Sequence, residues 1–427
     1  MITHIQARGT RPGPVAVPGR PPFRKETVMI DHRKLGRELE LFDSDPLAGA
    51  GLPFWLPAGA AARHAVEQYL RELERRNGYQ HVVSPPLGRP ALFELSRHLE
   101  HFAEDMFSAV DDELMLRPSL CPHHALIYRA RGRSHRELPL RIAEIGQMFR
   151  AERSGVLGGL SRVRVIALND GHTFCAPSQV VDEVGRELRL IRRAHADLGV
   201  RASSFRLSLR DDSAKFIDDD AMWAKAEEVL RLSLQNAGVE YEDAPGEAAF
   251  YGPKIDIQVR DDAGREQTLS TVQVDYDKPQ RFGLSYADAD ASHQVPVMIH
   301  RSLAGSMERL FAHLIEVQAG AFPAWYAPVQ LAVLPVAPAQ DDAARSVLAA
   351  APGLRAELSV EGSLGARVRQ ATLRRIPYIG IVGEREAAAG QIALRLRDGR
   401  EIPAQSVAEA LERIARVVAS RSHDLLG

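Results

Sequence analysis

The stretch "FRAERSGVLGGLSRVRVIALNDGHTFC", residues 149–175, guides the interpretation of the whole chain. It reads as a strand, a glycine-rich loop and a returning strand, which together predict a hairpin. Arg150 and Glu152 enter the loop, and Arg162 and Arg164 leave it. Because strand side chains alternate with period two, we expect each pair to share a face. Arginines gathered on one face favour an anion, and guanidinium groups match phosphate oxygens two at a time. The hairpin therefore predicts a polyphosphate site, and a solvated hairpin with paired charges is the alternative.

The composition indicates a folded, multidomain protein. The chain has 427 residues, of which 45% are hydrophobic and 26% are charged, with a net charge of −2. This length allows two or three cores, and the near-neutral charge means that a nucleic-acid partner would be held by local patches. No apolar run is long enough to span a membrane, so no membrane is expected. The two cysteines fit a reducing compartment.

Three regions follow from the pattern along the chain. Residues 1–29 are rich in proline, glycine and arginine and are predicted to be a disordered tail. Residues 30–325 combine amphipathic helices with strands joined by short turns, which predicts an antiparallel α+β domain. Residues 326–427 alternate apolar strands with helices, which predicts a small α/β domain with a mostly parallel sheet.

Two further sets of residues are weaker signals by themselves. "GSMERL", residues 305–310, predicts a helix start that would attract an anion and carries Arg309. Cys121, His172 and His300 are metal-ligand types, but they lack the local spacing of a zinc finger. By spacing alone, each of the three is more often a packed or solvated residue.

Several long segments, in order, resemble class II aminoacyl-tRNA synthetases and, among them, threonyl-tRNA synthetases. "GYQHVVSPPL" resembles the first motif of the class, "FRAERSGVLGGLSRVR" the second and "GSMERL" the third. "TLRRIPYIGIVGERE" resembles the anticodon-binding domain. The resemblance begins near Ile30, and it implies a six-stranded antiparallel sheet flanked by helices, followed by an α/β anticodon-binding domain. It also implies a shortened form that lacks the N-terminal editing domain.

The resemblance assigns roles to individual residues. Arg150 would hold the α-phosphate and Glu152 the adenine amine, and Mg²⁺ would accompany the ATP. The implied ATP-binding residues are Arg150, Glu152, Arg162, Arg164, Ile166, Gln273, Ser306 and Arg309. The implied catalytic residues are Arg150, Arg309, His98, Gln273 and Lys254, with His98 as the base in transfer to tRNA. The implied ligands of one zinc ion per subunit are Cys121, His172 and His300, and the threonine-binding set adds Asp170 and Tyr251. The implied anticodon-reading residues are Glu361, Glu386 and Arg395.

Some positions depart from the family pattern. Ile166 stands where the family stacks an aromatic ring on adenine. Ser119 and Leu120 replace a Met-Asn pair beside Cys121, and Thr268 replaces a glutamine. Leu168 and Asn169 stand where the family shows Gln-Asp, and Glu361 stands where an asparagine is usual. These changes suggest a pocket adapted to weaker ATP binding or to a related amino acid.

The favoured hypothesis is a threonine–tRNA ligase. It would use ATP, threonine and tRNA(Thr), form a homodimer through the segment around Pro85 and work in the cytoplasm. Without an editing domain, it would also mischarge tRNA with serine and would not hydrolyse the product itself. One alternative is a paralogue that activates threonine or a related β-hydroxy amino acid for a non-tRNA acceptor. A second alternative is a non-catalytic RNA-binding regulator.

Overall fold

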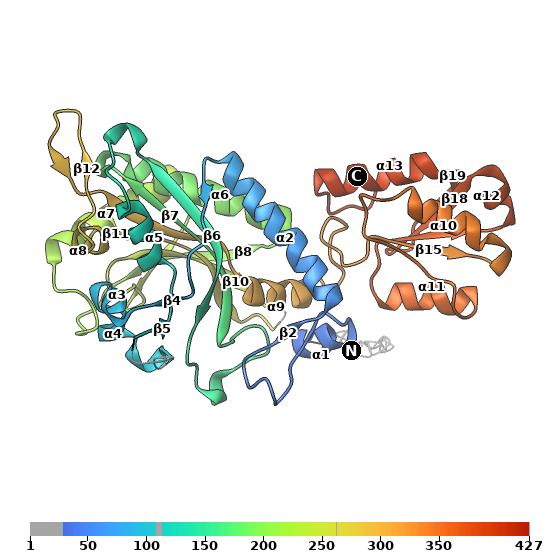
Figure 1. Cartoon of the computed structure of the whole chain (residues 1–427), viewed down its shortest axis with the longest axis horizontal. Helices are drawn as coiled ribbons and strands as arrows, with labels where there is room; N and C mark the ends of the chain where they lie inside the picture. Colours follow the sequence, from blue (N-terminus) through green and yellow to red (C-terminus); the bar gives the residue numbers. More distant parts are fainter. Residues whose placement is uncertain (1–28, 108–112, 262, 427) are drawn as a thin grey trace, which may run out of the picture.

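The computed structural model describes residues 29–107, 113–261 and 263–426, arranged as two bodies that each surround one sheet (Figure 1). The expected tail at residues 1–28 lies outside the described residues. In the described part of the chain, no helix is long and apolar enough to cross a membrane.

The larger body is built on an eight-stranded sheet with the order β3-β6-β7-β14-β11-β10-β8-β9. The strands from β6 to β8 in this order pair antiparallel, and each edge strand pairs parallel with its neighbour. The expected antiparallel sheet is therefore confirmed as the centre of a wider sheet. The eight strands are β3 (Gln80–His81), β6 (Leu140–Phe149), β7 (Val165–Cys175), β8 (Ala202–Leu209), β9 (Glu242–Pro245), β10 (Lys254–Arg260), β11 (Glu266–Asp275) and β14 (Val297–Ser306).

Two segments whose residue patterns predict longer strands form only short ones. The segment "QHVVSPPL" forms a strand only over its first two residues, and "LSYADA" forms only the two-residue β12. The prolines in the first segment cannot donate ladder hydrogen bonds, which limits pairing there. The short pairs outside the main sheet are β1 (Phe42–Asp43) with β2 (Phe54–Trp55), β4 (Leu87–Gly88) with β5 (Met115–Leu116), and β12 (Tyr286–Ala287) with β13 (His293–Gln294).

Alternation along β11 separates the core from the site. Val272 and Val274 are fully buried in the main apolar core, on the face that the long helices cover. Gln273 and Asp275 point to the opposite face, because successive strand side chains alternate. Strand β11 therefore contributes apolar side chains to the core on one face and polar side chains to the site on the other.

Helices cover the two faces of this sheet. The main core unites apolar residues of α2, α6 and α9 with one face, and α5 packs its apolar side on the other. Pro57 is the first residue of α2, and α6 ends at Gly199 with a left-handed backbone at φ 76°. The helices are α1 (His32–Glu38), α2 (Pro57–Arg76), α3 (Pro90–Leu95), α4 (His98–His101), α5 (Cys121–Arg129), α6 (Val180–Leu198), α7 (Asp220–Asn236), α8 (Asp277–Arg281) and α9 (Met307–Val317).

The hairpin at residues 149–175 is confirmed, with Phe149 opposite Val165 in the register of β6 and β7. Strand alternation, from which we expected each charged pair to share a face, does not apply to these residues. Arg150, Glu152, Arg162 and Arg164 all lie in the loop between the two strands. The returning strand continues to Cys175, so it carries the Asn-Asp-Gly-His segment.

The smaller body has a five-stranded sheet with the order β16-β15-β17-β18-β19. Its first three strands are parallel, but β18 and β19 pair antiparallel, so the expectation of a mostly parallel sheet is only half right. The links before β18 and β19 are too short for a parallel crossover, which needs about a dozen residues. The elements are β15 (Leu331–Pro335), α10 (Asp341–Ala349), β16 (Ala356–Leu358), α11 (Leu364–Leu373), β17 (Tyr378–Val382), α12 (Glu384–Ala389), β18 (Gln391–Leu396), β19 (Glu401–Ser406) and α13 (Val407–Ser420).

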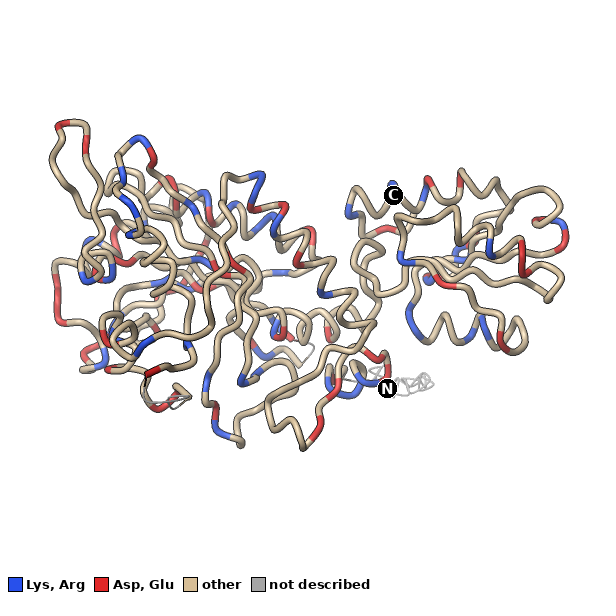
Figure 2. The backbone as a smooth tube through the Cα atoms, in the orientation of Figure 1, with Lys and Arg blue, Asp and Glu red and all other residues tan. Residues whose placement is uncertain are grey.

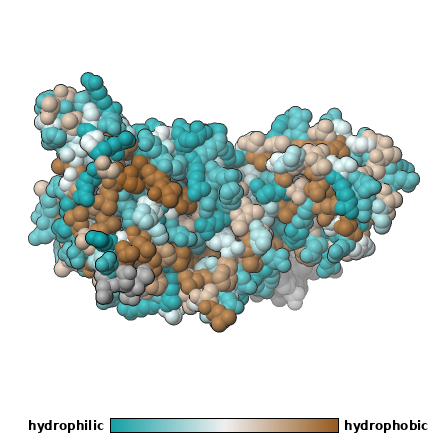
Figure 3. Space-filling view, viewed as in Figure 1, coloured by the Kyte–Doolittle hydropathy of each residue, from teal (hydrophilic) through white to brown (hydrophobic). Residues whose placement is uncertain are grey.

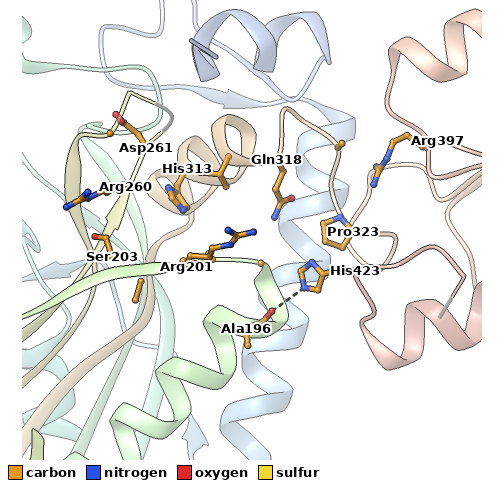
Figure 4. A pocket seen from close by; sticks show the side chains of 16 residues that line it. Ala196, Arg201, Ser203, Arg260, Asp261, His313, Gln318, Pro323, Arg397 and His423 are labelled. Atoms are coloured by element: carbon orange, nitrogen blue, oxygen red, sulfur yellow. Dashed lines mark hydrogen bonds between the residues drawn. The ribbon is translucent and has the colours of Figure 1, made fainter. Parts of the chain in front are cut away.

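A cleft of about 1010 Å³ lies where the two bodies meet (Figure 4). On its rim, His423 Nε2 lies 3.1 Å from the carbonyl oxygen of Ala196. Arg421 forms an ion pair of 2.7 Å with Glu72, which also joins the two bodies. Positive and negative residues are interspersed over both bodies (Figure 2), in keeping with the net charge of −2.

Candidate active site

A cavity of about 460 Å³ opens on the polar face of the large sheet. Its walls come from α4, from the start of α5, from the hairpin loop and from strands β10 and β11. The predicted site residues that line it are His98, Cys121, Arg150, Tyr251, Lys254 and Gln273. The fold thus brings together residues that are widely separated in the sequence.

Cys121, His172 and His300 form one cluster, as the resemblance implied. All three are buried, and their ligand atoms lie within 4.8 Å of one another. His172 and His300 are direct cross-strand neighbours on β7 and β14, and Cys121 is the first residue of α5. Sheet register, rather than sequence spacing, assembles this cluster.

Hydrogen bonds behind His172 determine which of its nitrogens faces the cluster. His172 Nδ1 lies 2.7 Å from His124 Nδ1, and His124 Nε2 lies 3.2 Å from Glu144 Oε2. A carboxylate only accepts, so His124 carries its proton on Nε2 and accepts at Nδ1 from His172. His172 Nε2 therefore presents a lone pair to the cluster.

The same logic applies to His300. Its Nε2 lies 3.0 Å from Oδ2 of Asp275, which also holds Lys278 Nζ at 3.0 Å. His300 Nδ1 is thus the nitrogen with the lone pair, and it faces His172 Nε2 at 2.8 Å. Two facing lone pairs repel unless a cation or a proton lies between them. With a cysteine sulfur beside them, this donor set fits zinc.

Polar groups beside the cluster could bind a small substrate. Asp170 Oδ2 lies 3.9 Å from His172 Nε2, and burial raises the pKa of Asp170 to about 7. The Tyr251 hydroxyl donates to Oε1 of Gln273. Lys278 Nζ lies 3.1 Å from the centre of the Tyr251 ring, a cation–π contact. The wall next to the cluster therefore offers both acceptors and fixed positive charge.

The predicted phosphate-binding arginines differ in how far they are engaged. Arg150 has a buried Nε without a hydrogen-bond partner in the described structure, and burial lowers the pKa of its guanidinium. Burial, and then the charge of Arg150, lowers the pKa of Arg309. Arg309 donates from Nη1 to the carbonyl oxygen of Thr268 at 3.2 Å, and Ser306 caps α9 by accepting from the Arg309 amide at 3.1 Å. These two half-buried cations are suited to an anion.

Arg162 and Arg164, the other two arginines predicted to bind ATP from this loop, make hydrogen bonds within the protein. Arg162 Nε donates to Glu152 at 2.8 Å, so the adenine-binding role predicted for Glu152 requires this bond to open or be shared. Arg164 donates to the carbonyl oxygens of Glu152 at 3.0 Å and Ala50 at 3.2 Å, and so it holds the loop. Ile166 is half-buried on β7.

His98 and Lys254 both line the cavity. His98 is 6% exposed on α4, and burial lowers its pKa well below the usual value. Lys254 Nζ lies 2.8 Å from Oδ2 of Asp256 on the same strand. An imidazole kept neutral in this way is suited to accepting a proton.

The predicted anticodon residues lie on the smaller body. Glu361 is exposed after β16, and Arg395 is exposed on β18, 4.0 Å from Glu401. Glu386 caps α12 by accepting from the Gly383 amide at 3.1 Å. Their roles stay predictions.

Sequence reasoning missed the residues behind the cluster. His124, Glu144, Asp275 and Lys278 support the two histidines, yet none was singled out. His124 follows Cys121 by one helical turn, which was the available signal, because i and i+3 share a helix face. Glu144 and Asp275 could not be chosen without the sheet register.

Comparisons with known proteins agree with this geometry. Residues 104–318 match the family model "tRNA synthetase class II core domain (G, H, P, S and T)", and residues 330–416 match "Anticodon binding domain". A threonine–tRNA ligase from Geobacillus sp. (strain WCH70) is 47% identical over 87% of this chain and 59% of its own length. One from Streptococcus sanguinis (strain SK36) is 46% identical over 94% of this chain and 63% of its own length. The chain thus spans about 60% of the length of these curated relatives.

A solved structure supports the same assignment over both bodies. The RNA-binding domain of threonyl-tRNA synthetase from Cryptosporidium parvum Iowa II superposes with a TM-score of 0.86 and 31% identity. The match covers 91% of this chain and 98% of that structure. With a class II core, an anticodon-binding domain and these relatives, the chain belongs to the threonyl-tRNA synthetase family of class II tRNA synthetases.

Proposed function

We propose that this chain is a threonine–tRNA ligase, which joins threonine to ATP as threonyl-adenylate and then transfers it to tRNA(Thr). The observation that carries the proposal is the buried cluster of Cys121, His172 and His300, with Asp170 beside it. A site of this kind suits an amino acid with both an amino group and a side-chain hydroxyl. The family membership supports the same reaction class.

The cluster would hold one zinc ion per subunit through Cys121 Sγ, His172 Nε2 and His300 Nδ1. Bound there, zinc would supply a Lewis-acid centre for the amino group and hydroxyl of threonine. Asp170 would accept from the hydroxyl, and Tyr251 and Gln273 would line the substrate wall. Valine has no hydroxyl, so it would leave Asp170 unpaired in a buried site, which is a strong basis for rejection.

The arginines would bind the phosphates of ATP, with Mg²⁺ bound to the nucleotide. Arg150 would contact the α-phosphate, since its Nε is buried and has no partner in the described structure. Arg309 and Arg162 would lie toward the γ-phosphate. Fixed cations stabilise the charge that develops as the carboxylate attacks the α-phosphorus and pyrophosphate leaves. Lys254, Ser306 and the backbone near Ile166 would complete this side of the pocket.

The second step would use His98. Its imidazole would take the proton of the ribose hydroxyl while that oxygen attacks the threonyl carbonyl carbon and AMP leaves. The smaller body would receive the anticodon near Glu361, Glu386 and Arg395. We place the boundary between the catalytic and anticodon domains at residues 325 and 326.

We also infer a homodimer through the segment around Pro85. Val83, two residues before it, is 95% exposed, which is unusual for a large apolar side chain. Apolar residues gather on one face of the larger body (Figure 3). Light scattering on the wild type and on Val83→Lys tests this inference, because a dimer that uses this segment should dissociate in the variant.

The experiment for the proposed function is aminoacylation of tRNA(Thr) by zinc-loaded protein. The proposal expects threonine-dependent charging that is lost in Cys121→Ala. Threonyl-adenylate formation without charging would instead favour the paralogue that loads a non-tRNA acceptor. The departures at Ile166 and Glu361 are the observations that keep this alternative in view.

A further inference from the structure

His98 is held between two serine hydroxyls, and these define its protonation. Ser96 Oγ lies 2.7 Å from His98 Nδ1 and 3.3 Å from the carbonyl oxygen of Phe93. A hydroxyl has one proton, and a carbonyl oxygen only accepts, so Ser96 donates to Phe93 and accepts from His98 Nδ1–H. Because Ser96 is 1% exposed, water does not replace this arrangement. His98 Nε2 is then the unprotonated nitrogen.

Ser119 lies on the other side of the ring and has two possible acceptors. Its Oγ lies 2.9 Å from His98 Nε2 and 3.3 Å from Cys121 Sγ. Both Ser119 and Cys121 line the same cavity as His98. The single hydroxyl proton can therefore be given to the base or to the sulfur, but not to both.

The acceptor that the Ser119 hydroxyl prefers depends on whether Cys121 Sγ carries a proton or binds a metal ion. A neutral thiol is a weak acceptor, so the imidazole lone pair is preferred at an empty cluster. A sulfur that ligates a metal is an anionic thiolate and a much better acceptor. Metal binding at the cluster would thus draw the hydroxyl of Ser119 away from His98.

We propose that Ser119 is a positioning residue that couples the metal cluster to the base of the transfer step. In the metal-loaded site its hydroxyl donates to Cys121 Sγ and leaves His98 Nε2 open to the ribose hydroxyl. In the metal-free site the hydroxyl donates to His98 Nε2 and blocks it. The inference rests on the proposed function, and it concerns a position where the family pattern has methionine rather than serine.

Carbethoxylation of His98 by diethylpyrocarbonate, followed by mass spectrometry of its peptide, measures how open Nε2 is. The full chain is stripped with a chelator and compared with and without added zinc, as wild type, Ser119→Ala and Ser119→Thr. We expect zinc to speed His98 modification several-fold in the wild type and in Ser119→Thr. In Ser119→Ala the modification should be fast with or without zinc.

A zinc effect of equal size in Ser119→Ala, or no zinc effect in the wild type, would overturn the proposal. Ser134→Ala is the matched control, because Ser134 is a half-buried capping serine that does not line the cavity of His98 and Ser119, and it should behave as the wild type. Threonine-dependent pyrophosphate exchange on the same preparations reports separately on the proposed function. If the wild type shows no threonine-dependent exchange, the proposed function is refuted, but the measurement of His98 modification is not affected.

Discussion

Asp275 accepts a hydrogen bond from His300, with Oδ2 lying 3.0 Å from Nε2. Asp275 is itself held by Lys278 and by the amides at the start of α8. The carboxylate therefore fixes both the tautomer and the orientation of the imidazole, so that Nδ1 faces the cluster. Outer partners of this kind orient metal ligands and raise their basicity.

Replacing Asp275 with asparagine should weaken zinc binding, and it should also lower stability because the buried Lys278 loses its counter-charge. An amide keeps the size but can no longer enforce an N–H on His300 Nε2, so we expect zinc affinity to fall by about 10- to 100-fold. Competition with a chromophoric chelator measures the change. Asp277→Asn is the control, because Asp277 faces Arg97 rather than His300. Equal affinity in Asp275→Asn and the wild type would contradict the assignment.

Arg150→Ala should abolish most adenylate formation. The Nε of its guanidinium is buried and has no hydrogen-bond partner in the described structure, and a positioned charge of this kind contributes about 10²- to 10³-fold to the rate. The measurement is threonine-dependent pyrophosphate exchange at saturating threonine. Arg153→Ala lies three residues away with a side chain that is 88% exposed, so its rate should stay within about twofold of the wild type. Similar rates in both variants would remove Arg150 from the catalytic residues.

Arg301→Met should destabilise the larger body strongly. Arg301 is fully buried, 2.7 Å from Glu74 and 3.4 Å from Glu187, with its guanidinium 4.3 Å from the centre of the Tyr79 ring. The charges are close, although neither Nε nor Nη2 of Arg301 makes a hydrogen bond in the described structure. Removing the cation leaves two buried carboxylates uncompensated, at a cost of about 3–5 kcal/mol.

Thermal melts followed by circular dichroism check this prediction. The matched control is Arg231→Met, which breaks a partly exposed pair with Asp243 and should cost under about 1 kcal/mol. A melting temperature for Arg301→Met that equals that of Arg231→Met would show that the buried network does not support the strand behind the site.

The stability that Glu144 provides should depend on pH. Burial opposes its charge, but hydrogen bonds from His124 and Ser84 and the charge of Arg117 outweigh it and lower the pKa of Glu144 to about 2. A lowered carboxyl pKa stabilises the folded state above the usual value near 4.5 and loses that contribution as the pH falls toward 2. The full contribution is on the order of 3 kcal/mol.

Melting temperatures of the wild type and Glu144→Gln between pH 7 and pH 3 test this dependence. The difference in melting temperature between the wild type and Glu144→Gln should be constant above about pH 5 and should shrink below it. A difference in melting temperature that stays unchanged down to pH 3 would mean that His124, Ser84 and Arg117 do not lower the pKa of Glu144.

The local sequence pattern was enough to predict much of the fold, but it predicted less of the candidate site. Pro57 begins α2 and Gly199 follows the last residue of α6, and such helix ends can be predicted because the backbone preferences of proline and glycine act locally. The hairpin was predicted correctly, but strand alternation was a poor basis for orienting Arg150 and Arg162, because both lie in the loop beyond the ends of the strands. The register that sets His172 opposite His300 depends on strands far apart in the chain, so only the family resemblance could suggest the cluster.

Amino-acid-dependent ATP–pyrophosphate exchange on zinc-loaded protein tests the central claim most directly. The account predicts rapid exchange with threonine, weaker exchange with serine, and exchange with valine lower by about 10⁴-fold, because valine leaves buried polar groups unpaired. The same protein with Cys121→Ala should lose the threonine signal. Valine within tenfold of threonine, or no exchange with threonine at all, would contradict the account.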